Sequence, residues 1–321
     1  MENIFIKNKL DYYIVLILSM FTLIWNNYFN KLIIAGLGLV TWTLLYMTDK
    51  ERKNTDFVLL KMLTLSVPLS FINIFGGLYS ESILSWFNII YIIIIFRFCI
   101  YNFKMDRIYF DVIALYTIFF LGISIIPVLV ATDTIDALKQ YLNIAACTLA
   151  LIIGSILKYK INKKQITRLQ EYYIGATEIT ALGVFIQFLM VKFFDNPVGY
   201  YVYFGGYRHA FGFLFADFSF LSLYLSSGAA MLYFTKHSRT NGNIIWIVDI
   251  VLLLLASILT SARTGIVSFL LIFCLFINIR FFQLLLKGSI KTISITILGF
   301  ALVSASYFLM LKIRSGAIFS G

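Results

Sequence analysis

The chain has 321 residues, of which 61% are hydrophobic and 13% are charged, and its formal net charge is +11. Soluble domains are about half apolar and about a quarter charged, so this composition excludes an ordinary soluble domain. The basic charge is typical of a membrane protein whose Lys and Arg residues lie in cytoplasmic loops, and it does not require a nucleic-acid partner.

Eleven apolar stretches of about 16 to 24 residues follow one another, and each is long enough to cross a hydrocarbon core of ~30 Å. No alternating segments of about ten residues indicate a membrane β-barrel. Because backbone groups in lipid must satisfy their own hydrogen bonds, the sequence predicts an all-α, polytopic transmembrane helical bundle, a single integral membrane domain over residues 1–321. The predicted spans are 10–25, 32–47, 57–79, 83–100, 109–130, 140–157, 173–194, 211–235, 244–260, 264–279 and 292–311.

The distribution of basic residues orients this predicted bundle. With the N-terminus inside, 17 of the 26 Lys and Arg residues lie in inner segments, six lie in outer segments and three lie inside span ends. Lys and Arg concentrate in the cytoplasmic loops of membrane proteins, so we expect the N-terminus inside and, after eleven spans, the C-terminus outside. The predicted location is the cytoplasmic membrane, with the chain as a multi-pass protein.

Two features of the inner side each have two explanations. Residues 158–173 are basic with interleaved Ile and Leu, which favours either an amphipathic helix on anionic lipid or a solvated loop. Two carboxylates in the inner halves of spans and one near an inner end are costly there, and they either pair with Lys61 or Arg97 inside the bundle or relay protons. These carboxylates are Asp111, Glu178 and Asp249.

The longest clearly outer loop, residues 195–209, is rich in Tyr and Gly and ends in Arg208 and His209. Its aromatic rings are either an interfacial belt or platforms for a sugar. Asp217 is predicted in the outer half of the next span, about two helical turns from the outer end. Asp217 and His209 are the candidate general bases, and Asp217 is alternatively a partner for an arginine.

The tightest turn in the chain, residues 259–265, places Arg263 between two strongly apolar spans at the outer side. An arginine near hydrocarbon is costly unless paired, and its planar guanidinium suits bidentate contact with phosphate. Arg314 follows the last predicted span beside Ser315 and Gly316. Arg208, Arg263 and Arg314 either converge on one polyanion or are separate surface charges.

Two short motifs in the second half of the chain resemble those of Wzy-type polysaccharide polymerases and the related O-antigen ligases. One is the entry to the span after the Tyr/Gly loop, and the other is a Thr-x-Ser-Arg-x-Gly-like turn. The motifs read Tyr207-Arg208-His209-Ala210-Phe211-Gly212-Phe213 and Thr260-Ser261-Ala262-Arg263-Thr264-Gly265. By motif, the resemblance covers about residues 195–321, and the first half matches only by its run of spans.

The resemblance implies transfer of an undecaprenyl-pyrophosphate-linked oligosaccharide onto a glycan at the outer face of the membrane, which builds capsular polysaccharide, exopolysaccharide or O-antigen. It implies that Arg208, Arg263 and Arg314 bind the diphosphate, and that Asp217 or His209 acts as the base. No cofactor or metal is expected. Besides the donor and membrane lipid, a flippase and a chain-length regulator are the partners that the resemblance implies, and nucleic acid is not among them.

Such polymerases continue with an outer loop and further spans, so a chain that stops at Gly321 is expected to lack the C-terminal part of the family's pattern. Two other functions compete with the polymerase hypothesis. A lipid-linked oligosaccharide flippase would show two similar halves and charges near mid-depth, which the sequence lacks. A structural membrane subunit would need no outer arginines.

Overall fold

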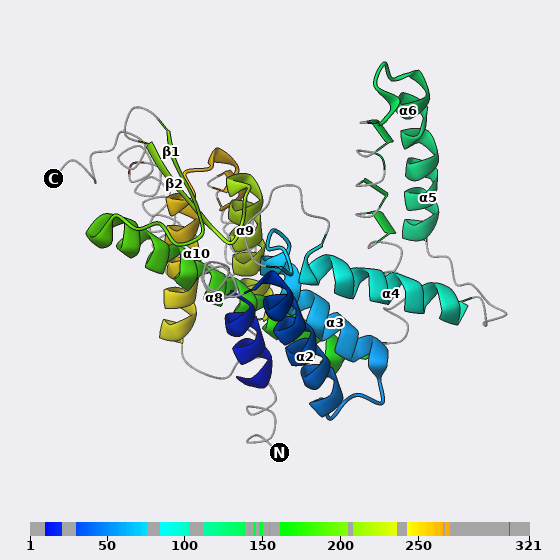
Figure 1. Cartoon of the computed structure of the whole chain (residues 1–321), viewed down its shortest axis with the longest axis horizontal. Helices are drawn as coiled ribbons and strands as arrows, with labels where there is room; N and C mark the ends of the chain where they lie inside the picture. Colours follow the sequence, from blue (N-terminus) through cyan, green and yellow to red (C-terminus); the bar gives the residue numbers. More distant parts are fainter. Residues whose placement is uncertain are drawn as a thin grey trace, which may run out of the picture. The chain divides into compact units, whose positions relative to one another are not determined.

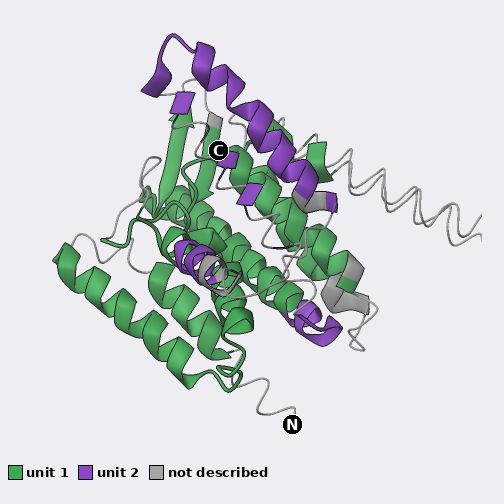
Figure 2. Cartoon of the chain, turned by 90° about the vertical axis from the view of Figure 1, so that its right-hand side faces the viewer, with its two compact units in different colours: residues 1–89, 169–321 green, residues 90–168 purple. Residues whose placement is uncertain are grey.

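We describe the protein from a computed structural model of the whole chain, drawn in Figure 1. It is mostly helical, as the all-α prediction requires, with one two-stranded β-hairpin in the part described. The chain divides into two compact units, residues 1–89 with 169–321 and residues 90–168, coloured separately in Figure 2. The structure describes residues 10–20, 30–75, 84–102, 112–135, 161–204, 208–235, 243–265 and 267–269, and single positions between 137 and 154 and at 308.

The helices and strands follow the predicted spans in order, with a first helix at Leu10–Met20. The named elements are α2 (Lys31–Thr48), α3 (Thr55–Ser66), η1 (Val67–Leu69), α4 (Trp86–Asn102), α5 (Val112–Ser124), α6 (Ile126–Val130), α8 (Lys163–Phe194), β1 (Tyr200–Phe204), β2 (Arg208–Phe213), α9 (Phe218–Thr235) and α10 (Asn243–Leu259). Most of the predicted spans 140–157, 264–279 and 292–311 lies outside the described residues.

Two described helices, α2 and α8, are long and apolar enough to cross a membrane by length and composition. Shorter apolar helices occupy five further predicted spans, at Leu10–Met20, Trp86–Arg97, Leu115–Val130, Phe218–Tyr233 and Val248–Leu259. The described helices therefore establish a largely apolar helical protein with two helices of spanning length. They do not establish eleven spans.

Proline divides two of the predicted spans. The span predicted at 57–79 is wrong as one helix, because α3 ends at Ser66 and Pro68 lies in the short 3-10 helix η1. The span at 109–130 is likewise divided, since α5 ends at Ser124 and α6 begins at Ile126 with Pro127 in its first turn. Proline has no N–H to donate and clashes with the preceding turn, so it is tolerated at a helix start and not inside one.

Helix α8 is the longest described helix, and all but its first six residues belong to the larger unit. Its 32 residues have a length of about 48 Å, well beyond a hydrocarbon core of ~30 Å. The helix begins in the basic segment with a capping box, in which Asn162 and Gln165 each accept the other's amide hydrogen. The basic residues from Lys163 onward therefore belong to the first turns of α8.

Close contacts hold other helices of the larger unit against α8. Gly175 lies directly beneath the hydroxyl of Tyr13, and Gly228 of α9 lies against the buried Thr177. A Cβ atom at either glycine would lie less than 3 Å from its neighbour, so Gly175 leaves room for the Tyr13 ring and Gly228 leaves room for the Thr177 side chain. The N-terminal helix and α9 thus both pack against α8.

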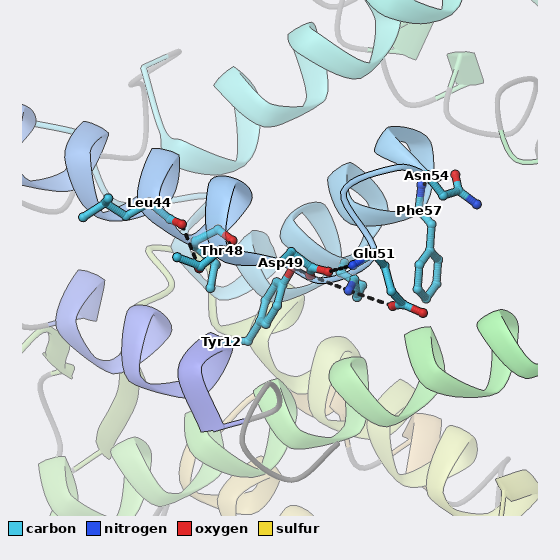
Figure 3. A network of polar contacts seen from close by, with 9 residues as sticks. Tyr12, Leu44, Thr48, Asp49, Glu51, Asn54 and Phe57 are labelled. Atoms are coloured by element: carbon cyan, nitrogen blue, oxygen red, sulfur yellow. Dashed lines mark hydrogen bonds and ion pairs between the residues drawn. The ribbon is translucent and has the colours of Figure 1, made fainter. Parts of the chain in front are cut away.

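A network of polar contacts joins the N-terminal helix to the turn between α2 and α3, where Figure 3 shows the Tyr12 side chain reaching toward Asp49. The Lys61 ammonium is 2.5 Å from Asp49 Oδ2 and 3.1 Å from Glu51 Oε2, and the Tyr12 hydroxyl donates to the same Asp49 oxygen. Both Lys61 and Asp49 are almost fully buried. Among the described ion pairs, Lys61 therefore pairs with carboxylates of the turn before its helix, and the predicted pairing with Glu178 or Asp249 is wrong for this residue. Asp111, the third predicted carboxylate, lies outside the described residues.

We expect Lys61→Met to destabilise the protein by about 3–5 kcal/mol, because it leaves the Asp49 carboxylate buried without its cation. Thermal unfolding in detergent measures this as a lower melting temperature. Lys53→Met is the matched control, since Lys53 is an exposed lysine of the turn that contains Asp49 and Glu51. The double variant Lys61→Met/Asp49→Leu should recover much of the loss. Equal effects of Lys61→Met and Lys53→Met would contradict the assignment.

Candidate functional site

The loop after α8 forms an antiparallel β-hairpin, so the prediction that this region is only loop and helix is wrong. Strand β1 pairs with β2 in a register that places Tyr203 opposite His209 and Phe204 opposite Arg208. The sequence carries a hairpin pattern here, because aromatic and β-branched residues flank Gly205-Gly206. That pattern was overlooked among the apolar spans.

One side chain of α8 joins both strands of the hairpin. The Gln187 amide nitrogen donates to the carbonyls of Val198 and Tyr200, at 2.7 and 3.0 Å, and its Oε1 accepts from the Phe213 amide at 2.9 Å. Gln187 is fully buried. Since a buried amide costs free energy unless its groups are paired, these three hydrogen bonds fix the hairpin on α8.

Aromatic side chains also attach the hairpin to α8. The fully buried Phe211 ring lies between Phe188 of α8 and Tyr201 of β1, with centroid distances of 5.6 and 5.4 Å. Gly183 of α8 leaves room for the Phe213 ring, which a Cβ atom at that position would meet at 2.0 Å. The base of the hairpin is therefore buried against the helix, while Tyr203 near its tip is 53% exposed.

His209 lies between two tyrosine rings on the hairpin. Its Nδ1 is 2.5 Å from the Tyr201 hydroxyl, and its ring centroid lies 5.0 Å from that of Tyr203. Partial burial lowers the pKa of His209 and raises the pKa of Tyr201. Both shifts favour the neutral forms, so the pair is an uncharged imidazole beside a protonated phenol at neutral pH.

Asp217 is the residue that caps α9, and the prediction that it lies two turns inside a span is wrong. Its Oδ1 accepts the amide hydrogens of Ser219 and Phe220 at 2.7 and 3.1 Å, and the helix begins at Phe218. A carboxylate at this place satisfies N–H groups that have no partner within the helix. The carboxylate is nevertheless exposed, so it also faces solvent.

Arg263 lies in the tight turn that the sequence predicts. Helix α10 ends at Leu259, and the turn passes through Ser261 with a left-handed φ of 58°. The buried Thr260 hydroxyl donates to the Ser257 carbonyl at 2.7 Å and accepts from the Ala262 amide at 3.2 Å. The residues before Arg263 are thus buried and hydrogen-bonded, while Arg263 itself is exposed.

The residues after Arg263 dock on α9. The hydroxyls of Thr264 and Ser222 are 3.2 Å apart, and Gly265 lies so close to Ser222 that a Cβ atom would meet it at 2.3 Å. The same stretch of α9 receives the hairpin, because the rings of Tyr200 and Phe204 contact Phe218 at 5.3 and 6.4 Å. The first turns of α9 therefore join the hairpin, Asp217 and the Arg263 turn.

The structure describes the side chains of three of the five predicted site residues. His209, Asp217 and Arg263 belong to the hairpin, to the start of α9 and to the turn that docks on α9. Arg208 is the first residue of β2, and only its backbone is described; Arg314 lies outside the described residues. Gln187 was missed, because a single polar residue inside an apolar span carries no sign of what it binds.

The arrangement offers a cation, a carboxylate and aromatic rings for binding, and a neutral imidazole that can accept a proton. Within the described part of the chain, no group of three or more His, Cys, Asp or Glu residues is placed to hold a metal ion. Arg263 makes no ion pair with a described acidic residue, so its charge faces outward.

No protein family, curated protein or solved structure matches this chain.

We expect Gln187→Leu to loosen the hairpin, because it leaves two carbonyls and one amide of the strands without a partner, at about 1–3 kcal/mol for each buried group. Hydrogen–deuterium exchange in detergent should show faster exchange over residues 198–213 and little change in α9. Gln170→Leu is the control, since Gln170 lies about 25 Å back along the same helix. An unchanged exchange rate in the hairpin of Gln187→Leu would show that the hydrogen bonds of Gln187 do not hold the hairpin on α8.

We also expect the protein to lose stability as the pH falls below 6.5, the ordinary pKa of histidine. Because the pKa of His209 is lower in the folded chain than in the unfolded chain, the unfolded chain binds more protons in this range. The contribution is complete above pH 6.5 and is lost as the pH falls through the folded pKa. Melting temperatures from about pH 7.5 to about pH 5.5 test this, and His209→Phe should show a smaller decrease than wild type. Parallel curves would contradict the role of His209.

Proposed function

We propose that this chain is a metal-independent membrane glycosyltransferase that polymerises oligosaccharide repeat units carried on undecaprenyl pyrophosphate. The observation that carries the proposal is the Arg263 turn, in which an exposed arginine projects from a buried, hydrogen-bonded support. Fixing a planar, permanently charged donor group in this way suits bidentate binding of a diphosphate. The motif resemblance of residues 207–213 and 260–265 to Wzy-type polymerases supports the same chemistry.

The proposed topology is the eleven-span bundle with the N-terminus inside, which places the hairpin and the Arg263 turn at the outer face. The apolar helices α2 and α8 and the five shorter ones supply the described part of that bundle. A polyprenyl tail dissolves in the bilayer, and its diphosphate lies at the interface. An arginine at the end of an apolar helix such as α10 is at the depth where that diphosphate would lie.

In the proposed reaction, a hydroxyl of the acceptor glycan attacks the anomeric carbon of the donor sugar, and the bond from that carbon to the diphosphate oxygen breaks. Arg263 binds the diphosphate and stabilises the negative charge that develops as it leaves, and Arg208 and Arg314 are proposed to assist. The proton of the attacking hydroxyl goes to a base near the outer face.

His209 is better suited than Asp217 to be that base. The Asp217 carboxylate already accepts two amide hydrogen bonds at the start of α9. Burial lowers the pKa of His209, so its imidazole is neutral at neutral pH, and the Tyr201 hydroxyl holds its Nδ1. In the tautomer that carries its hydrogen on Nδ1, where the Tyr201 oxygen accepts it, Nε2 is the proton acceptor.

We expect Arg263→Ala to abolish polymerisation while the protein still folds, because Arg263 is exposed and its removal breaks no buried contact. Glycan chain length in a strain that carries only the variant gene is the measurement. Arg263→Lys keeps the charge and loses the fork of donors, so we expect a large but incomplete loss, about tenfold or more.

Arg52→Ala is the matched control, since Arg52 is exposed in the turn between α2 and α3, far from the hairpin in the chain. It should leave chain length unchanged. Glycan chains of normal length in Arg263→Ala would refute the proposed function. A transport defect without any change in chain length would instead favour an oligosaccharide flippase.

A further inference from the structure

The hairpin displays three rings in a row, Tyr201, His209 and Tyr203, here termed the aromatic strip. Alternate residues of a strand share a face, and the register places Tyr203 opposite His209 and Tyr201 opposite Phe211. His209 lies 5.9 Å from the Tyr201 ring and 5.0 Å from the Tyr203 ring. The strip therefore extends from Tyr201, which contacts the buried Phe211, to the exposed Tyr203.

Two buried rings beside the aromatic strip have a clear structural role, which the strip itself does not share. Phe211 is fully buried against Phe188, and the Phe213 ring fills the space at Gly183, so these two rings attach the hairpin to α8. Tyr203, by contrast, is 53% exposed, and both Tyr201 and His209 are partly exposed. The Tyr203 ring in particular leaves about half of its residue surface open to a ligand.

The chemistry of the aromatic strip is mixed. Its ring faces are apolar, but its edges carry two phenol hydroxyls and an imidazole, of which Tyr201 and His209 are hydrogen-bonded to each other. That bond fixes the two rings relative to one another, so little conformational entropy is lost when a ligand covers them. A purely apolar partner would leave these polar edges buried and poorly paired.

We infer that the aromatic strip binds the sugar rings of the glycan. The C–H face of a pyranose is weakly positive and packs on the negative face of an aromatic ring, while its hydroxyls bond to polar groups at the ring edge. The inference rests on the proposed function for the origin of the glycan and adds a separate subsite to it. Arg263 binds the diphosphate end of the donor, and the aromatic strip binds sugars without phosphate.

The two elements that carry the subsites, the hairpin and the Arg263 turn, both contact the first turns of α9. The hairpin contacts Phe218 through Tyr200 and Phe204, and the Arg263 turn contacts Ser222 one helical turn further along. A glycan on the strip and a diphosphate on Arg263 are thus held by surfaces attached to the same helix end. Phe204 lies on the opposite face of the hairpin from Tyr203, so the aromatic strip and Arg263 are two separate subsites that one helix end supports.

The test uses the purified full chain in detergent and a lipid-free, phosphate-free oligosaccharide of one repeat unit, released from the polysaccharide of the source strain. Saturation-transfer NMR and titration measure its binding. We expect Tyr203→Ala to weaken binding about fivefold or more, and Tyr203→Phe, which keeps the ring, to weaken it less than about twofold. Melting temperatures confirm that both variants are folded.

Phe194→Ala is the matched control, since Phe194 is a 71% exposed aromatic residue at the end of α8 and outside the strip. It should bind the oligosaccharide as wild type does. Equal binding by Tyr203→Ala and wild type would overturn the inference. Weaker binding together with a decreased melting temperature in that variant would also overturn it, because the ring would then support the fold.

The two proposals fail separately in this design. If Tyr203→Ala binds normally while Arg263→Ala abolishes polymerisation, the aromatic strip is refuted and the proposed function stands. If oligosaccharide binding depends on Tyr203 while Arg263→Ala polymerises normally, the polymerase proposal fails and the chain is a glycan-binding membrane protein.

Discussion

A single buried amide holds the region on which the proposed function depends. Gln187 bonds to the carbonyls of Val198 and Tyr200 and to the amide of Phe213, so it satisfies backbone groups of both strands at once. A two-stranded hairpin is marginal by itself in water. Its attachment to a long helix, through Gln187 and the buried Phe211, gives His209 and Tyr203 defined positions.

The first turns of α9 unite parts of the chain that are far apart in sequence. Asp217 caps the helix, Phe218 receives the hairpin, and Ser222 receives the turn that carries Arg263. Small residues make this convergence close, since Gly265 lies where any side chain would collide with Ser222. Functional groups on a turn become precise when rigid elements support the turn on both sides.

The charged residues divide into two kinds by their surroundings. Lys61 is buried and neutralised by Asp49 and Glu51, so it supports the fold. Arg263 is exposed and makes no described ion pair, so its charge is available to a ligand. Both are basic residues associated with apolar helices, and the sequence around them does not separate these roles. The difference arises from whether a carboxylate lies in the adjacent turn and faces the same interior.

The sequence by itself determined the helical, apolar character of the chain, the places of α2 and α10 to within a residue, and the tight turn at Arg263. These follow from composition and from spacing over a few residues, because apolar runs and local turns are properties of neighbouring side chains. The hairpin and the capping role of Asp217 follow from local patterns that the surrounding apolar runs obscured. Only the tertiary structure decided the partners of Lys61 and the hydrogen bonds of Gln187. Each of these depends on partners in three dimensions, and a buried polar group takes whichever partner the packing of the helices brings within hydrogen-bond distance.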